Sequence, residues 1–239
     1  MTGPTDSPHP SHPYIRRRGR TTVAQARGLS ELLARYRVEP ADWAEASAAR
    51  RGLEIGFGMG HGLLEWARQV PASRLLGVEL YEPGIGALVD RLHKLEVANV
   101  AVVDQPAQDV VAALPDGCLD EVRVFFPDPW PKKRHHKRRL LQPAFVTALA
   151  RVMNDGALLR VATDWTPYAD WVREVMEAQA GFATQLDTVR AAEQSSVDDD
   201  VSGAAEARPR TNFERRGERL GHDIHDLIYV RKRSSTESR

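Results

Sequence analysis

From residue 53 onward, the sequence alternates short runs of aliphatic residues with longer stretches of mixed polarity. The apolar runs fall at residues 53–55, 74–80, 100–104, 119–126 and 157–163. Such runs indicate buried strands, and the stretches after them predict crossover helices near residues 63–70, 85–95, 110–114, 140–152 and 167–178. The alternation therefore predicts an α/β fold with a doubly wound, mostly parallel sheet.

The rest of the chain is organised around this one region. A chain of 239 residues is long enough for one domain with a buried core. We expect that domain at 49–233, after a basic arm and helix at 14–48 and between disordered tails at 1–13 and 234–239. The acidic residues 191–207 predict a mobile insertion, and residues 226–230 predict a final strand, antiparallel to its neighbours.

Charge, cysteine content and hydropathy limit which partners and which cellular compartment the sequence predicts. Lysine plus arginine and aspartate plus glutamate number 33 each, so any surface for a polyanion must come from local clustering. The lone Cys118 excludes an intramolecular disulfide and fits a reducing compartment. No apolar run approaches the roughly 18 residues that span a bilayer. We therefore expect a cytoplasmic protein without membrane contact.

Glycines gather between the first predicted strand and its helix, in the run LEIGFGMGHG at 53–62. At Gly56, Gly58 and Gly60 the backbone can turn tightly and approach a nucleotide-like ligand closely. The spacing fits the G-x-G-x-x-G fingerprint of dinucleotide sites in neither register. A tight turn between strand and helix, without any ligand, is the simpler alternative.

Two carboxylates flank this loop. Glu54 lies at the end of the first strand, where it would repel a pyrophosphate and attract a cationic ligand. Glu79 closes the second strand, a position from which an acidic side chain accepts hydrogen bonds from a ribose diol. Together with the loop, they favour S-adenosylmethionine, which carries an ammonium and a sulfonium, over the nicotinamide cofactor of an oxidoreductase.

The fourth apolar run leads into FFPDPWPKKRHHKRR at 125–139. Its three prolines restrict the backbone around Asp128 and Trp130, which predicts a stiff, non-helical loop. This loop is expected to face the same crevice as the glycine loop, because ligands of open parallel sheets bind beyond the carboxyl ends of the strands.

Basic residues are concentrated directly after that loop, and a second group lies in the arm at 16–20. The run consists of Lys132, Lys133, Arg134, Lys137, Arg138 and Arg139. On a neutral protein such a cluster predicts a phosphate-binding surface, although a solvated helix face is the simpler interpretation. The adjacent His135 and His136 have no carboxylate or cysteine at ligand spacing, so we expect no metal site.

Four segments resemble, in order, the motifs of tRNA (guanine-N7)-methyltransferases. They are LEIGFGMG, FFPDPWPKKRHHKRR, ATDWTPYA at 162–169 and TNFERRGERLGHDIHDLIY at 211–229. The resemblance implies a Rossmann-like class I methyltransferase fold. It also implies methylation of guanosine N7 in the variable loop of tRNA, at position 46, by in-line transfer from S-adenosylmethionine. tRNA is then the partner, and no obligatory protein partner is evident.

The same resemblance implies a role for individual residues. Asp128 takes the catalytic position. The residues implied in cofactor binding are Glu54, Gly56, Gly58, Gly60, Glu79, Pro106 and Asp128. Those implied in substrate binding are Lys132, Asp164, Thr211, Asn212, Phe213 and Glu214.

One position departs from the pattern of the family. An acidic or amide residue usually stands seven places after the asparagine that opens the third strand, and the count from Asn99 gives Pro106. The adenine contact then comes either from the backbone near Pro106 and Ala107, or from Asp104 or Gln105 after a local shift.

Two further questions are open from the sequence. Trp130 and Phe213 can either stack on a base or pack the loop against the core. A non-catalytic RNA-binding module is the alternative to an enzyme. The intact carboxylates at positions 54, 79, 128 and 164 argue against it.

Overall fold

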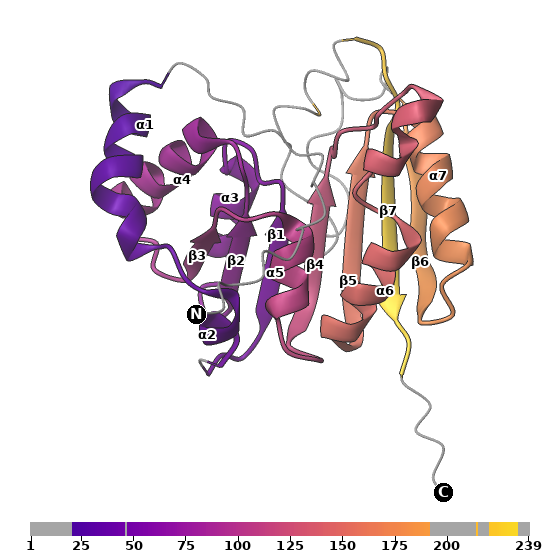
Figure 1. Ribbon diagram of the computed structural model, residues 1–239, viewed down its shortest axis with the longest axis horizontal. Helices are drawn as coiled ribbons and strands as arrows, with labels where there is room; N and C mark the ends of the chain where they lie inside the picture. The colour runs from indigo at the N-terminus through magenta and orange to yellow at the C-terminus, as the bar shows by residue number, and fades with distance from the viewer. Residues whose placement is uncertain (1–20, 46, 192–213, 215–219, 234–239) are drawn as a thin grey trace, which may run out of the picture.

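The computed structural model describes residues 21–45, 47–191, 214 and 220–233. In these ranges the chain forms a seven-stranded sheet with helices on both faces (Figure 1). The strands are β1 (Arg51–Ile55), β2 (Arg74–Val78), β3 (Val100–Val103), β4 (Leu119–Phe125), β5 (Met153–Thr163), β6 (Phe182–Arg190) and β7 (Ile224–Arg231). The helical segments are α1 (Val23–Arg27), η1 (Gly28–Leu32), η2 (Leu33–Arg35), α2 (Pro40–Glu45), α3 (His61–Gln69), α4 (Glu82–Lys94), α5 (Ala107–Ala113), η3 (Lys133–Arg138), α6 (Pro143–Val152) and α7 (Thr166–Glu177).

The strands follow the order β3-β2-β1-β4-β5-β7-β6. β1 pairs in parallel with both β2 and β4, and β3 and β5 extend the parallel part on either side. β7 lies between β5 and β6 and is antiparallel to both. The mostly parallel sheet and its antiparallel final strand are thus confirmed.

Successive side chains of a strand point to opposite faces of the sheet, and apolar side chains form a layer on each face. On one face α2, α5, α6 and α7 cover inward residues such as Leu76, Val122 and Leu159, and α5 and α6 lie in front of the sheet in Figure 1. On the other face α3 and α4 cover Leu75 and Val102. No helix in the described ranges is long and apolar enough to cross a membrane.

Strand β6 was not predicted from the sequence. Its residues FATQLDTVR are mainly polar, and Phe182 alone among them is buried. β6 forms one edge of the sheet, so its outward positions stay in solvent and the chain there lacks the apolar pattern of a central strand. The final strand is also longer than predicted, extending from Ile224 to Arg231.

Several predictions fall outside the described residues. They concern the tails, the basic residues of the arm at 16–20, the insertion from 192 onward, and the residues Thr211, Asn212 and Phe213. The part of the N-terminal segment that is described, from residue 21, folds onto the domain. It packs on α4 and, through residues 36–38, pairs with the free edge of β3.

The N-terminal segment crosses α4 at very close range. A Cβ atom on Gly28 would lie 2.1 Å from the carbonyl oxygen of Gly86, and one on Gly86 would lie 2.2 Å from that of Gln25. Beside the crossing, the buried Asp90 is paired with Arg27 and with Lys94, each at 2.6 Å. Glycine is therefore required at both crossing positions for this approach.

We expect Gly86→Ala to lower the stability of the protein by about 1–3 kcal/mol, because the new methyl group collides with backbone that cannot rotate away. Thermal denaturation measures the effect. Gly62→Ala is the matched control in α3, since its Cβ would meet no atom closer than 3.5 Å. Equal melting temperatures for the Gly86→Ala variant and the wild type would contradict the close crossing.

Candidate functional site

A cavity of about 610 Å³ opens at the carboxyl ends of β1, β2 and β4. The strand order reverses here, with β2 and β4 on opposite sides of β1, and open α/β sheets bind ligands at such a switch point. Four segments line the cavity, namely the loop after β1, the end of β2, the turn after β3 and the proline-rich loop after β4. The structure thus brings together the glycine loop and the Asp128 loop, as predicted.

The glycine loop adopts a backbone that other residues rarely take. Gly56, Gly58 and Gly60 have φ values of 76°, 55° and 72°, in the left-handed region. Gly56 and Gly58 line the cavity. Gly60 precedes α3 and packs on α4 instead, where a Cβ atom would lie 2.7 Å from the Leu88 side chain.

Glu79 joins the glycine loop to the end of β2. Its carboxylate accepts hydrogen bonds from the backbone N–H groups of Gly58 (2.8 Å), Leu80 (2.7 Å) and Tyr81 (3.0 Å). Glu79 and Tyr81 both line the cavity. Tyr81 was not predicted as a site residue, and its place two residues after Glu79 is the only sign of it in the sequence.

Glu54 lies beneath the loop rather than on the cavity wall. Its side chain is 4% exposed, and its Oε2 has no hydrogen-bond partner among the described residues. The guanidinium of Arg123 is turned to Glu121, at 2.7 Å, and stacks on the ring of Trp66 at 3.7 Å. Burial raises the pKa of the Glu54 carboxyl to about 7, against a lowering by Arg123 and with a smaller rise from Glu121.

The turn after β3 contains the four residues that the sequence offers as contacts of the adenine, and they differ in their position relative to the cavity. Gln105 and Ala107 line the cavity, whereas Pro106 precedes α5 and is absent from the wall. The carboxylate of Asp104 pairs with Arg37 at 2.5 Å. Gln105 and the Ala107 backbone are therefore the best-placed of the four candidates.

Backbone strain adds to the prolines in shaping the Asp128 loop. Phe126 and Trp130 have φ values of 50° and 46°, so two bulky residues sit in the left-handed region on either side of Asp128. The Phe126 N–H donates to the Ala162 carbonyl on the neighbouring strand at 2.7 Å. Asp128 and Trp130 both line the cavity.

The basic run after the loop divides into exposed and inward-facing residues. Arg139 is 3% exposed, donates to the Pro129 carbonyl at 3.0 Å and lies over the rings of Tyr168 and Trp171. The prediction that Arg139 belongs to a phosphate-binding surface is therefore wrong, because its guanidinium is buried and binds the loop instead. Arg138 lines the cavity and stacks on Trp130 at 5.1 Å. The exposed members are Lys132, Lys133, Arg134 and Lys137.

Of the residues predicted to bind the substrate, none that the structure describes lines the cavity. Lys132 is exposed beside it, and the Oδ2 of Asp164 lies 3.5 Å from Nδ1 of His222. Glu214 is fully buried and pairs with Arg190 of β6 at 2.7 Å. Within the described ranges, no group of three or more His, Cys, Asp or Glu side chains is arranged to hold a metal ion.

Comparison with known proteins gives consistent matches. A family described as "Putative methyltransferase" matches residues 49–227. The tRNA (guanine-N(7)-)-methyltransferase of Nitrosococcus oceani is 42% identical over 236 residues, covering 96% of this chain and 94% of that protein. The protein of the same name from Ralstonia pickettii is 40% identical over 237 residues, covering 96% and 87%.

Solved structures share the fold at lower identity. A 16S rRNA (adenine(1408)-N(1))-methyltransferase from Catenulisporales acidiphilia superposes with a TM-score of 0.56 at 20% identity, over 82% of this chain and 94% of that one. The 16S rRNA methyltransferase KamB has a TM-score of 0.56 at 16% identity, over 80% and 92%. These likenesses confirm the Rossmann-like methyltransferase architecture.

We expect Arg139→Met to lower the melting temperature, since it removes the hydrogen bond to the loop and the cation between two aromatic rings. Losing a bond to a charged group typically costs about 1.5–3 kcal/mol. Lys137→Met is the control, as it removes an exposed charge from the same run. Differential scanning calorimetry compares the two, and equal melting temperatures would contradict a loop-holding role for Arg139.

Proposed function

This chain belongs to the family of tRNA (guanine-N7)-methyltransferases, and we propose that it methylates N7 of a guanosine in tRNA with S-adenosylmethionine as cofactor. Position 46 of the variable loop is the proposed target. The observation that carries the proposal is the cavity at the switch point, where the glycine loop, Glu79 and Asp128 surround one space.

The residues around the cavity fit S-adenosylmethionine. Gly56 lines the wall with open space around the position of a Cβ atom, which leaves room for close approach to a ligand. Glu54 lies beneath the glycine loop, and its Oε2, which has no hydrogen-bond partner among the described residues, suits an ammonium group held at that loop. On the wall itself, the Glu79 carboxylate suits a ribose diol. Gln105 offers an amide to the adenine. When bound, S-adenosylmethionine supplies the sulfonium methyl group.

Guanine needs little chemical assistance to react at N7. Its N7 carries an in-plane lone pair that is not protonated at neutral pH, so no base is required to create the nucleophile. The new N–C bond forms in line as the C–S bond breaks. The protein therefore acts mainly by positioning the two reactants.

Asp128 is the proposed catalytic residue. Methyl transfer leaves a positive charge on the purine, and a carboxylate held beside the ring stabilises that charge more in the transition state than in the ground state. The left-handed residues on either side and the three prolines hold Asp128 in place before the substrate arrives. It can also accept a hydrogen bond from guanine N1–H or the exocyclic amine.

The exposed basic residues complete the proposed RNA surface. Guanine N7 lies in the deep major groove of A-form RNA, which side chains do not enter, so the target must be in a loop or junction. Lys132, Lys133, Arg134 and Lys137 are exposed in the segment between Trp130 and Arg138, which both line the cavity, and they can contact phosphates around such a target. The contribution of the arm at 16–20 stays a prediction.

The direct test incubates the protein with labelled S-adenosylmethionine and unmodified tRNA and maps the label. We expect it at N7 of the variable-loop guanosine. Asp128→Asn should lose turnover by about 100-fold or more, the usual effect of removing one group that stabilises transition-state charge. Its affinity for S-adenosylhomocysteine should stay within about threefold of the wild type.

Asp42→Asn, an exposed carboxylate on α2, is the matched control and should keep full turnover. Label at another atom would contradict the proposed target. Binding of tRNA with no label at all would favour a non-catalytic RNA-binding module.

Cofactor affinity should depend on pH through Glu54. Because burial raises the pKa of this carboxyl to about 7, most molecules carry it neutral at pH 6 and ionised at pH 8. A cationic ammonium prefers the ionised form, so binding of S-adenosylhomocysteine should strengthen several-fold between pH 6 and 7.5. At higher pH, once the α-amino group of the ligand loses its proton, binding should weaken again.

Isothermal titration calorimetry across this range measures the effect. Glu54→Gln should bind more weakly at pH 7.5 and lose the rise in affinity between pH 6 and 7.5. The same rise in the variant as in the wild type would rule out Glu54 as its source.

A further inference from the structure

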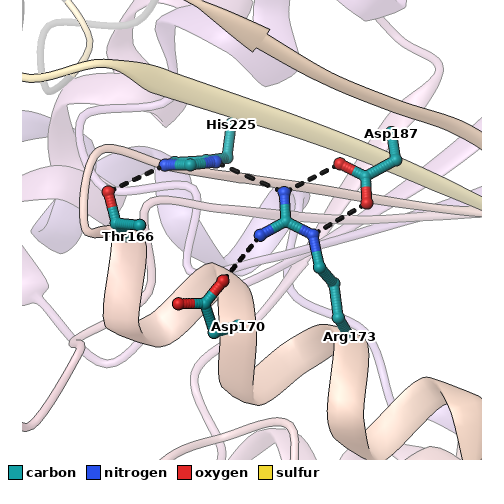
Figure 2. A network of polar contacts seen from close by, with 5 residues as sticks. All are labelled: Thr166, Asp170, Arg173, Asp187 and His225. Atoms are coloured by element: carbon teal, nitrogen blue, oxygen red, sulfur yellow. Dashed lines mark hydrogen bonds and ion pairs between the residues drawn. The ribbon is translucent and has the colours of Figure 1, made fainter.

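A polar network outside the cavity joins α7 to the two antiparallel strands (Figure 2). Arg173 of α7 makes two bonds to Asp187 of β6, at 2.7 and 2.8 Å, and one to Asp170 on its own helix at 2.9 Å. The ring of His225, from β7, lies between Arg173 and Thr166, as Figure 2 shows. The cavity does not include any of these residues.

Both ring nitrogens of His225 are engaged. An Arg173 N–H group faces Nδ1 at 3.4 Å, and a guanidinium only donates, so Nδ1 must accept. Nε2 then carries the proton and donates to the hydroxyl of Thr166 at 3.0 Å. His225 is 4% exposed, and this arrangement requires the neutral ring in a single tautomer.

The network holds the turn that carries Asp164, one of the proposed substrate contacts. Asp164 lies between the end of β5 and Thr166, the first residue of α7. His225 pairs with Thr163 across the sheet and contacts Thr166 through its ring, so it fixes the chain on both sides of Asp164. His222, just before β7, touches the Asp164 carboxylate itself.

We propose that His225, held in its neutral form by Arg173, is a positioning residue that sets the direction of Asp164 toward the substrate. The proposal rests on the proposed function, because it takes Asp164 as a contact of the target guanosine or its neighbours. Arg173 and Asp187 join the helix that begins at Thr166 to the edge strand. His225 contacts both Arg173 and Thr166, so it holds the turn before the helix in the same position.

Acid should release the turn. Protonation would place a second cation beside Arg173 and convert Nδ1 from an acceptor into a donor that faces another donor. Burial lowers the pKa of His225 and Arg173 lowers it further, against smaller opposite effects of the carboxylates Asp170, Asp223 and Asp187. The neutral ring therefore persists below the ordinary histidine range, and the effect appears on the acid side of the activity profile.

The test compares kcat/KM for tRNA in a double-mutant cycle of His225→Leu and Asp164→Asn. Thr166→Val replaces His225→Leu in a second cycle, because it removes the partner of the ring with little change in shape. In the background of the wild-type Asp164, we expect His225→Leu and Thr166→Val each to raise KM for tRNA about tenfold and so to lower kcat/KM. In the Asp164→Asn background the same changes should cost less than threefold.

A purely structural role would give additive losses in both cycles, and that result would overturn the proposal. The affinity for S-adenosylhomocysteine should stay within about threefold in every variant. With S-adenosylmethionine saturating at every pH, so that Glu54 does not limit the rate, the acid limb of the wild-type kcat/KM profile for tRNA should flatten in His225→Leu. An unchanged limb counts against the proposal. His225→Gln, which keeps a donor toward Thr166, should restore part of the affinity for tRNA.

An NMR titration of the His225 ring separates failure of this inference from failure of the proposed function, because it needs no activity. We expect a neutral ring with the proton on Nε2 at neutral pH, and a pKa below the ordinary value of histidine. A ring protonated near pH 6.5, or one with its proton on Nδ1, would overturn the inference even if the enzyme methylates tRNA. Absence of methylation by the wild type, with the expected ring signals, would overturn the proposed function, and with it the role of Asp164 toward a guanosine, while the neutral ring of His225 would stand.

Discussion

β1 pairs in parallel with β2 on one side and with β4 on the other, and the meeting of the glycine loop, Glu79 and the Asp128 loop at the cavity follows from this pairing. The loops after these three strands must leave the sheet at one edge, so the glycine loop, Glu79 and the Asp128 loop meet although they are far apart in the sequence. The left-handed backbone of Gly56 and Gly58 turns the first loop, and the bonds from Glu79 fix it to β2. Loss of this register would separate the groups without altering any one of them.

Pattern and spacing predicted the parts of the molecule that depend on local chemistry. The central strands, their helices and the meeting of the two loops follow from apolar runs and from the rule for parallel sheets. Strand β6 was not predicted because it lies at the edge of the sheet, where most of its side chains are in solvent and the apolar pattern of a buried strand is missing. Arg139 was misplaced for a related reason, since a run of basic letters does not reveal which side chain turns inward to meet Tyr168 and Trp171.

The charged neighbours of Glu54 beneath the site were also not predicted from the sequence. Glu54, Arg123 and Arg160 stand side by side on β1, β4 and β5, and Glu121 pairs with both arginines. Buried ion pairs contribute little net stability, because desolvation offsets most of their attraction. Their effect here is on ionisation: Arg123 is bonded to Glu121, so the Oε2 of Glu54 has no hydrogen-bond partner among the described residues.

Because β7 is antiparallel to its neighbours, it places its first residues at the same edge of the sheet as the cavity, which a parallel strand could not do. Because β7 runs against β5, its first residues lie at the edge where β5 ends, and His225 stands opposite Thr163. The chain just before β7, including His222, therefore reaches Asp164 on the same side as the cavity. Glu214 is tied to this region through Arg190, at the carboxyl end of β6, which also pairs with Asp226 of β7. A parallel strand would have delivered these residues to the opposite edge, so the reversal of one strand brings the second half of the proposed substrate surface to the cofactor side.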